Sequence, residues 1–215
     1  MRVVIAGGHG QIALRLERRL AAAGHEPVGV VRNPDHVADL QKAGAESVVL
    51  DLEKASVEEL ASVVDGADAV VFAAGGGPGS GAARKETVDR GAAALLADAA
   101  ERAGVRRYLM VSSMGTDQAD PDSDDIFQVY LRAKAAADAD LRGRDLDWTI
   151  VKPGRLTDAE GTGRVTLDPD ARPREIPRED VAEALVAALE QDATVGKEFT
   201  LLSGDTPVAE ALARA

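Results

Sequence analysis

Short runs of consecutive apolar residues alternate along the chain with longer stretches in which apolar positions recur every three to four residues. The runs predict buried strands at 2–6, 27–31, 47–50, 69–74, 107–112, 147–151 and 198–202. The stretches between them predict helices at 10–23, 35–43, 56–64, 86–103 and 178–190. Because strands and helices alternate, the pattern indicates an α/β fold with a doubly wound, mostly parallel sheet covered by helices on both faces.

Glycine follows four of these helices, at Gly24, Gly44, Gly66 and Gly104. A glycine in this place is typical of a helix C-cap and is a structural feature. Two polar loops interrupt the alternation: 75–81 is glycine-rich, and 117–125 contains five aspartates. Both follow the carboxyl ends of predicted strands, where open α/β sheets bind ligands; for the aspartates, the interpretation we favour is a solvated surface loop.

The size and composition are those of one α/β domain spanning 1–215, with 45% hydrophobic and 29% charged residues. The stretch 153–180 is rich in Pro and Gly and is interpreted as a small C-terminal substrate region, not a separate domain. A net charge of −12, an aromatic content of 3% and the lack of a long basic run argue against nucleic acid as a partner. We expect a small-molecule substrate, and a monomer or homodimer.

The chain contains no cysteine, which excludes disulfides and thiolate catalysis. Its three histidines lack ligand spacing, so no metal site is expected. The first predicted strand starts directly after Met1, which leaves no room for a signal peptide. No apolar stretch approaches the ~20 residues of a membrane span. These features predict a cytoplasmic protein with no membrane partner.

The first strand runs into the turn Gly7-Gly8-His9-Gly10, and a helical pattern begins directly behind it. The spacing is G-x-x-G-x-x-A, with Ala13 as the small residue where helix meets strand. The unpaired amides and positive dipole end of a helix start attract an anion, and glycines let the backbone approach it closely. At the start of a strand–helix–strand pattern, this turn predicts a dinucleotide site in a Rossmann-type fold. An ordinary strand–helix turn is the alternative.

The second predicted strand ends in Arg32, not in the acidic residue that would select NAD. A guanidinium offers a fork of donors and a fixed charge, which suit a 2′-phosphate. We therefore expect NADP, with NAD as the alternative, and a merely solvated Arg32 as the other interpretation. Asp51 and Leu52 follow the third strand, where the carboxylate can either accept from the adenine amino group or cap the next turn.

Tyr130 and Lys134 form a Y-x-x-x-K pair in the helical pattern VYLRAKAAADADL. Residues four apart on a helix share a face. A neighbouring ammonium lowers the pKa of a phenol, which suits proton exchange with a carbonyl or alcohol near neutral pH. The alternative is a surface tyrosine on an amphipathic helix.

Ser112 and Ser113 end the fifth strand, at the sheet edge beside the predicted cofactor crevice. A hydroxyl there can hydrogen-bond the same carbonyl oxygen that Tyr130 protonates. Either serine can instead simply end the strand, but two adjacent serines favour one functional hydroxyl.

Together these segments resemble an atypical short-chain dehydrogenase/reductase, of the small NAD(P)-binding branch that includes NmrA-like and biliverdin-reductase-B-like proteins. The resemblance covers essentially the whole chain and rests on VVIAGGHGQIA, VVRNP, Asp51-Leu52, RYLMVSS, YLRAK, DWTIVKPGRLTD, EGTGRV and PREDVAEALVAAL. It implies an NADP-dependent oxidoreductase that transfers hydride between nicotinamide and a small carbonyl or alcohol, a quinone or a flavin.

The resemblance also implies roles for individual residues. The pyrophosphate would be cradled by Gly7, Gly10, Gln11 and Ile12, with His9 where a threonine is often found. The adenosine phosphate would be held by Arg32, and the adenine would lie at Asp51 and Leu52. The middle of the cofactor would be lined by Ala73, Ala74 and Gly75, and its nicotinamide carboxamide would lie along Pro153, Gly154 and Leu156. The catalytic residues would be Ser113, Tyr130 and Lys134, with Ser112 beside the cofactor and Lys134 also binding its ribose.

One more departure from the family and two other functions remain to be considered. Gly75-Gly76-Gly77 lengthens the loop after the fourth strand, and some relatives lack the tyrosine and act without it or only sense redox state. A redox-sensing regulator without turnover is therefore one alternative. A sugar epimerase or dehydratase is another, although such enzymes normally carry a larger lobe than the segment behind Pro153. Arg155 and Arg164 are the cations near the predicted substrate region.

Overall fold

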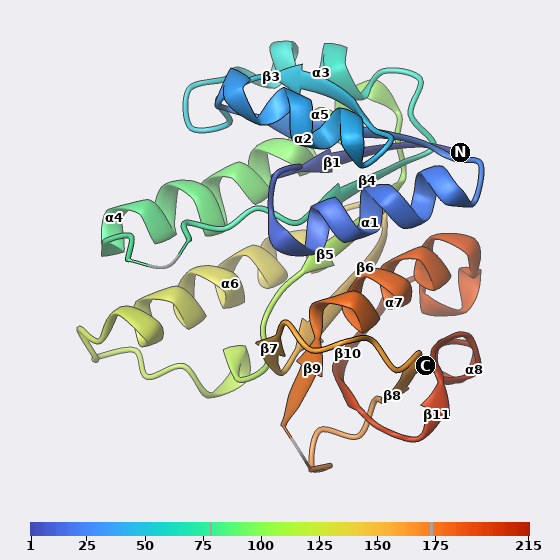
Figure 1. Cartoon of the computed structure of the whole chain (residues 1–215). Coiled ribbons are helices and arrows are strands. Elements are labelled where there is room, and N and C mark those ends of the chain that lie inside the picture. The colour runs from blue at the N-terminus through green and yellow to red at the C-terminus, as the bar shows by residue number, and fades with distance from the viewer. Residues whose placement is uncertain (78, 173) are drawn as a thin grey trace.

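The computed structural model describes residues 1–77, 79–172 and 174–215, and within them nine strands form one sheet (Figure 1). Seven are parallel: β1 (Arg2–Ala6), β2 (Glu26–Val31), β3 (Glu46–Val49), β4 (Ala69–Phe72), β5 (Arg107–Val111), β6 (Asp147–Pro153) and β10 (Lys197–Ser203). β8 (Arg164–Thr166) and β11 (Thr206–Pro207) extend one edge in antiparallel pairing. The order β11-β8-β10-β6-β5-β4-β1-β2-β3 reverses between β1 and β4, which opens a crevice at the carboxyl ends of these strands.

Helices cover both faces of the sheet (Figure 1). On one face, α1 (Gln11–Ala22), α7 (Arg178–Glu190) and α8 (Val208–Leu212) pack with the strands into one hydrophobic cluster. On the other, α3 (Val57–Val64), α5 (Ala93–Ala103) and α6 (Ile126–Arg142) form a second cluster. The short α2 (Val37–Lys42) packs Leu40 against the end of β2. The sheet is therefore buried on both sides, as its apolar runs require.

Shorter elements complete the chain. Before α5, the helix begins as α4 (Ala82–Arg84) and continues through a π-helical stretch, Lys85–Ala92. Turns of 3₁₀ helix lie at Pro34–His36, Thr116–Gln118 and Asp192–Thr194. β7 (Arg155–Thr157) and β9 (Glu175–Pro177) pair as a small separate parallel sheet within the segment 153–180.

The α/β architecture predicted from the alternating pattern is confirmed. Each predicted apolar run is a strand of the parallel sheet; β4 ends at Phe72 instead of 74, and β6 continues to Pro153. The predicted helix 35–43 is divided into a 3₁₀ turn and α2, and the one predicted at 86–103 begins at Ala82. The predicted helix-ending glycines adopt left-handed backbone, with φ of +80° at Gly24, +81° at Gly44, +70° at Gly66 and +73° at Gly104.

Local capping determines where two helices of the second face begin. Ser56 and Glu59 form a reciprocal capping box at the start of α3. Asp125 caps α6, since its carboxylate accepts from the amides of Phe127 (2.9 Å) and Gln128 (3.2 Å). Part of the aspartate-rich loop thus starts the helix that carries Tyr130.

Candidate functional site

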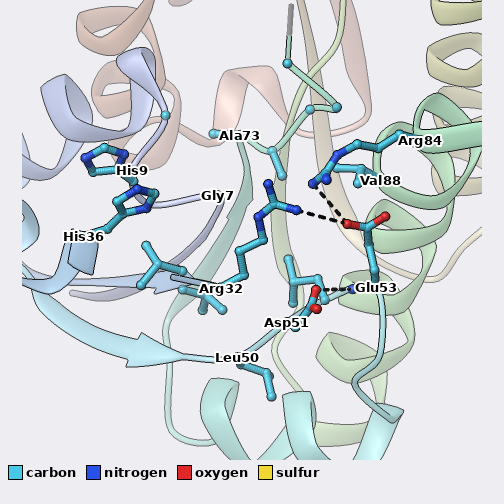
Figure 2. Close-up of a pocket in the computed structure, with 18 residues that line it drawn as sticks. Gly7, His9, Arg32, His36, Leu50, Asp51, Glu53, Ala73, Arg84 and Val88 are labelled. Carbon is cyan, nitrogen blue, oxygen red and sulfur yellow. Dashed lines mark hydrogen bonds and ion pairs between the residues drawn. The ribbon is translucent and has the colours of Figure 1, made fainter. Parts of the chain in front are cut away.

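A cavity of about 390 Å³ opens at the carboxyl ends of β1, β2 and β4 and beside the loop after β3 (Figure 2). The site residues predicted from sequence that line it are Gly7, His9, Gly10, Arg32, Asp51, Leu52, Ala73, Ala74 and Gly75. These residues come from four separate loops of the chain. The structure brings them together at the sheet edge where open α/β folds bind ligands.

The turn after β1 has the shape that a closely approaching ligand needs. Gly7 has a φ of +84°, and a Cβ at this position would lie 2.6 Å from the Cα of Ala74. Gly10 caps α1 in an extended conformation, and no side chain among the described residues caps this helix start. The amides of the first turn of α1 are therefore available to an anion, and the cradle fits a dinucleotide pyrophosphate.

Gln11 and Ile12 lie on the first turn of α1 but outside the lining of the cavity. The amide oxygen of Gln11 accepts from the Arg15 guanidinium at 2.9 Å. The Ile12 side chain is buried in the core beneath the turn. Only the backbone amides of these two residues are placed to serve the predicted pyrophosphate role.

Asp51 and Arg32 form the far side of the cavity, where an adenosine would lie. Asp51 accepts from the amide of Glu53 at 3.2 Å, and its carboxylate lies 3.1 Å from Lys54. The turn-capping alternative for Asp51 is thus present in this structure. Arg32 is exposed, and its guanidinium lies 3.5 Å from the carboxylate of Glu53 (Figure 2).

Two histidines stack at the mouth of the same cavity (Figure 2). The rings of His9 and His36 have centroids 3.6 Å apart and an interplanar angle of 11°. The Nε2 of His9 lies 3.1 Å from the Asp39 carboxylate. His9 therefore turns its ring toward α2 and away from the cradle, which leaves the cradle open.

Several lining residues are absent from the sequence prediction: Val30, Val31, His36, Leu50, Glu53, Gly76, Gly77, Arg84 and Val88. Glu53 was within reach of sequence reasoning, because it lies two residues beyond Asp51 in the loop after β3. Arg84 gave no such signal, since it lies on a helix that begins behind the glycine-rich loop.

The two serines at the end of β5 have different surroundings. Ser112 is buried, and its hydroxyl donates to the Asp138 carboxylate at 2.7 Å. Ser113 is half-buried, its hydroxyl donates to the carbonyl of Met114 at 3.2 Å, and it lies close enough to the Tyr130 phenol to lower the pKa of that phenol. Of the two, Ser113 is the one whose hydroxyl faces the tyrosine.

Burial raises the pKa of Tyr130 to about 12; the nearby Ser113 hydroxyl acts in the opposite direction, and the charges of Asp89 and Asp138 raise it further. This direction is opposite to the one expected from the Y-x-x-x-K spacing. The ammonium of Lys85 lies over the ring, 5.4 Å from its centroid. The phenol therefore keeps its proton at neutral pH.

Lys134 is buried, and its ammonium is held by groups other than the phenol. Its Nζ donates to the carbonyl oxygens of Val111 (3.1 Å) and Ala74 (3.4 Å) and lies 3.5 Å from the Asp89 carboxylate. Burial lowers the pKa of Lys134, and the negative charge of Asp89 opposes this shift. Asp89 also accepts from the amide of Gly76 at 3.0 Å.

These contacts connect Lys134 and Asp89 to the cavity. Ala74 and Gly76, which Lys134 and Asp89 contact, both line the cavity. The sequence prediction did not include Asp89 or Lys85; both lie on the π-helical stretch, where turns of this kind often mark functional sites.

Pro153, Gly154 and Leu156 lie outside the cavity lining. The carbonyl of Pro153 accepts from the Met114 amide at 3.0 Å, and the Gly154 amide donates to Leu201 at 3.1 Å. Leu156 packs on the core. Their predicted place along the nicotinamide stays a prediction. The nearby cations are engaged elsewhere: Arg155 pairs with Glu175, and Arg164 donates to the carbonyl of Asp205.

Within residues 1–77, 79–172 and 174–215, no three or more His, Cys, Asp or Glu side chains are arranged to hold a metal ion. Over the same residues, no helix has both the length and the apolar character that crossing a membrane requires.

The fold and the cradle define a class of dinucleotide-binding proteins, and the comparisons with known proteins agree. The chain belongs to the NAD(P)H-binding family, whose family model matches residues 7–192. This family membership and the Rossmann-type sheet place the chain among NAD(P)-binding proteins of the oxidoreductase and epimerase-like class.

Relatives match over nearly their full length. A Bacillus subtilis protein named as an uncharacterized sugar epimerase, YhfK, is 37% identical over 213 residues, which cover 99% of both chains. A Bacillus halodurans structure with the provisional name NAD-dependent epimerase/dehydratase is 39% identical, with a TM-score of 0.91 and full coverage of both chains. The Lactococcus lactis oxidoreductase YlbE is 27% identical, with a TM-score of 0.85 over 99% of this chain and 95% of its own.

Proposed function

We propose that the chain is an NADP-dependent oxidoreductase of the short-chain dehydrogenase/reductase type, in the NmrA-like and biliverdin-reductase-B-like branch. Its substrate class is a small carbonyl or alcohol, a quinone or a flavin. One observation carries this proposal: Tyr130 lies beside Lys85, whose ammonium is 5.4 Å from the ring centroid and donates at 3.0 Å to the carbonyl of Gly77 in the cavity lining. A proton donor beside a nicotinamide site is what carbonyl reduction requires.

In this proposal the cofactor is held by residues of the cradle and its surroundings. Gly7, Gly10 and the first-turn amides of α1 bind the pyrophosphate. Arg32 binds the 2′-phosphate, and Lys134 orients the ribose from its place beside Ala74. When bound, the nicotinamide supplies the hydride.

Tyr130 supplies the proton in this proposal. Its pKa of about 12 keeps the hydroxyl protonated at neutral pH, so the phenol can donate to a substrate oxygen that gains negative charge. Ser113 orients that oxygen through a second hydrogen bond, and solvent restores the proton to Tyr130. The raised pKa favours reduction over oxidation, because oxidation needs the phenol to begin as a base.

Tyr130→Phe tests the proposal, because it removes the proton donor and keeps the ring. We expect NADPH binding, measured by cofactor fluorescence, to stay unchanged. Turnover of quinones, flavins and aldehydes, followed by NADPH absorbance, should fall by about 10²–10⁴-fold.

Tyr108→Phe is the matched control. Tyr108 is the other tyrosine of the chain, and it is buried and donates to the carbonyl of Ala93 at 3.1 Å. This variant should lose some stability and keep its turnover. Unchanged turnover in Tyr130→Phe would remove the phenol from the mechanism.

The names of the Bacillus relatives favour a second candidate, a sugar epimerase or dehydratase. In that cycle the dinucleotide is oxidised and reduced again, so sugar nucleotides would be converted with no net change in NADPH absorbance. A panel that converts sugar nucleotides and leaves carbonyl compounds untouched would select this candidate. Binding of NADPH and NADP⁺ with different affinities and no turnover of either panel would instead indicate a redox sensor.

A further inference from the structure

Three charged side chains from separate segments meet on one wall of the cavity (Figure 2). The Glu53 carboxylate, in the loop after β3, lies between Arg32, which follows β2, and Arg84 of α4. Its Oε2 is 3.0 Å from Nη2 of Arg84 and 3.5 Å from Nη1 of Arg32. Two guanidinium groups thus share one carboxylate oxygen.

The carboxylate is held in place from its other side. Oε1 of Glu53 accepts from the Thr87 hydroxyl at 2.6 Å, and the backbone amide of Glu53 donates to Asp51 at 3.2 Å. The side chain of Glu53 is only 24% exposed. Both carboxylate oxygens therefore have partners, and the group is a fixed part of the cavity wall.

Arg84 has donor capacity that Glu53 does not use. Its Nε is buried and has no hydrogen-bond partner among the described residues. The side chain of Arg32 is 55% exposed, and its guanidinium lies farther from the Glu53 carboxylate than that of Arg84 does, 3.5 Å against 3.0 Å. A tetrahedral anion with three acceptor oxygens can meet more of these donors than a carboxylate oxygen does.

We propose that Arg84 is a second specificity-determining residue for the 2′-phosphate of NADP, and that Glu53 is the internal anion which this phosphate displaces from the two arginines. The assignment rests on the proposed NADP dependence. A phosphomonoester carries a charge of about −1.5 to −2 at neutral pH, so Glu53 and the phosphate repel each other and compete for the same donors. The preference for NADPH over NADH is therefore set by this competition.

A different role for Glu53 would select the other cofactor. An acidic residue in this wall can also accept from the ribose hydroxyls of NAD. The observed contacts favour competition, because Thr87 and Arg84 already engage both carboxylate oxygens. The two roles predict opposite effects of removing the charge, so one substitution separates them.

The experiment measures binding of NADPH, NADH, adenosine 2′,5′-bisphosphate and 5′-AMP by calorimetry or fluorescence. Glu53→Gln should tighten NADPH and the bisphosphate about tenfold. Arg84→Gln should weaken the same two ligands about tenfold or more. NADH and 5′-AMP, which lack the 2′-phosphate, should change by less than about threefold in both variants.

Matched controls remove a charge of the same sign nearby. Glu58→Gln, on α3, removes an exposed carboxylate that pairs with Arg102. Arg90→Gln, in the π-helical stretch, removes an exposed guanidinium that pairs with Glu86. Neither lines the cavity, so both should bind all four ligands as the unaltered protein does. Thermal unfolding of each variant confirms that it is folded.

Each other result overturns part of the reasoning. Weaker NADH binding by Glu53→Gln, with NADPH unchanged, would make Glu53 a ribose ligand and overturn the competition. Equal effects of Arg84→Gln on NADPH and NADH, or none, would remove Arg84 from the 2′-phosphate site while NADP dependence stands. If the unaltered protein binds neither dinucleotide, the proposed function itself fails, and this assignment with it.

Discussion

The buried carboxyl of Glu17 makes the stability of this fold depend on pH. Glu17 lies in α1 beneath the glycine turn, fully buried, and neither oxygen has a hydrogen-bond partner among the described residues. A Cβ on Gly8 would lie 2.9 Å from its Oε1, and one on Gly29 would lie 2.5 Å from it. Burial raises the pKa of Glu17 from 4.5 to about 8, with the charge of Arg18 acting in the opposite direction.

The sign of the effect follows from the two states. The folded pKa lies above the unfolded value, so the folded protein keeps a proton that the unfolded chain has released. The resulting stability is fully present below about pH 4.5 and is lost as the pH rises through about 8. The difference between the unfolded and folded pKa values of Glu17 corresponds to about 5 kcal/mol of unfolding free energy. About 3 to 4 kcal/mol of this is lost between about pH 5 and pH 8.

Glu17→Gln removes the titration and keeps the shape of the side chain. We expect its free energy of unfolding, measured with urea, to lose this part of the pH dependence. The difference between Glu17→Gln and the unaltered protein should therefore grow by about 3 to 4 kcal/mol, in favour of the variant, from about pH 5 to pH 8. Effects of the other titrating groups cancel in this difference.

Glu58→Gln provides the reference, because Glu58 is an exposed carboxylate on α3. Its difference from the unaltered protein should stay within about 0.5 kcal/mol across the same pH range. Parallel pH profiles for Glu17→Gln and the unaltered protein would refute the reasoning, since they would mean that Glu17 ionises in the folded state as it does in the unfolded chain.

Gly7→Ala and Ser56→Ala test the cradle and the fold around it, with Gly66→Ala as the control for the first. Gly7→Ala should abolish NADPH binding and lower the midpoint of thermal unfolding. An alanine in the left-handed backbone conformation of Gly7 costs about 1–2 kcal/mol, and its Cβ would lie 2.6 Å from the Cα of Ala74. Gly66→Ala carries a similar penalty with nothing within 4 Å, so it should bind NADPH normally. Ser56→Ala breaks the capping box with Glu59 at the start of α3 and should cost about 1 kcal/mol in urea unfolding, with binding unchanged.

The parallel sheet could be predicted because its strands are buried on both faces and therefore appear as unbroken apolar runs. β1 and β4 read as VVIA and AVVF, and their ends differ little from the predicted ones. β7, β8 and β9 could not be predicted in the same way. Each has only three residues, too few to show a period, and their pairing depends on segments distant in sequence.

The cradle could be predicted for a similar reason, since a strand, a glycine turn and a helix follow one another directly in the chain. The cluster of Arg32, Glu53 and Arg84 on the cavity wall could not be predicted from the sequence. Arg84 and Glu53 are far apart in sequence, and a charged residue in a loop or on a short helix is most often a solvated one. Only the fold shows that the two side chains meet and that Arg32 reaches the same carboxylate.

The Tyr130–Lys134 pair shows that the spacing of two residues does not determine the pKa of either one. A separation of four residues places both side chains on one face of α6, but the pKa of the phenol depends on what other elements bring to that face. The stretch before α5 contributes Asp89, which lies 3.5 Å from the Lys134 ammonium and whose charge raises the pKa of Tyr130. The Lys134 ammonium is therefore engaged by the Asp89 carboxylate and by the carbonyls of Val111 and Ala74, and the tyrosine keeps its proton. Burial and the charge of Asp89 therefore set the direction of the pKa shift of Tyr130, and neither can be predicted from the spacing alone.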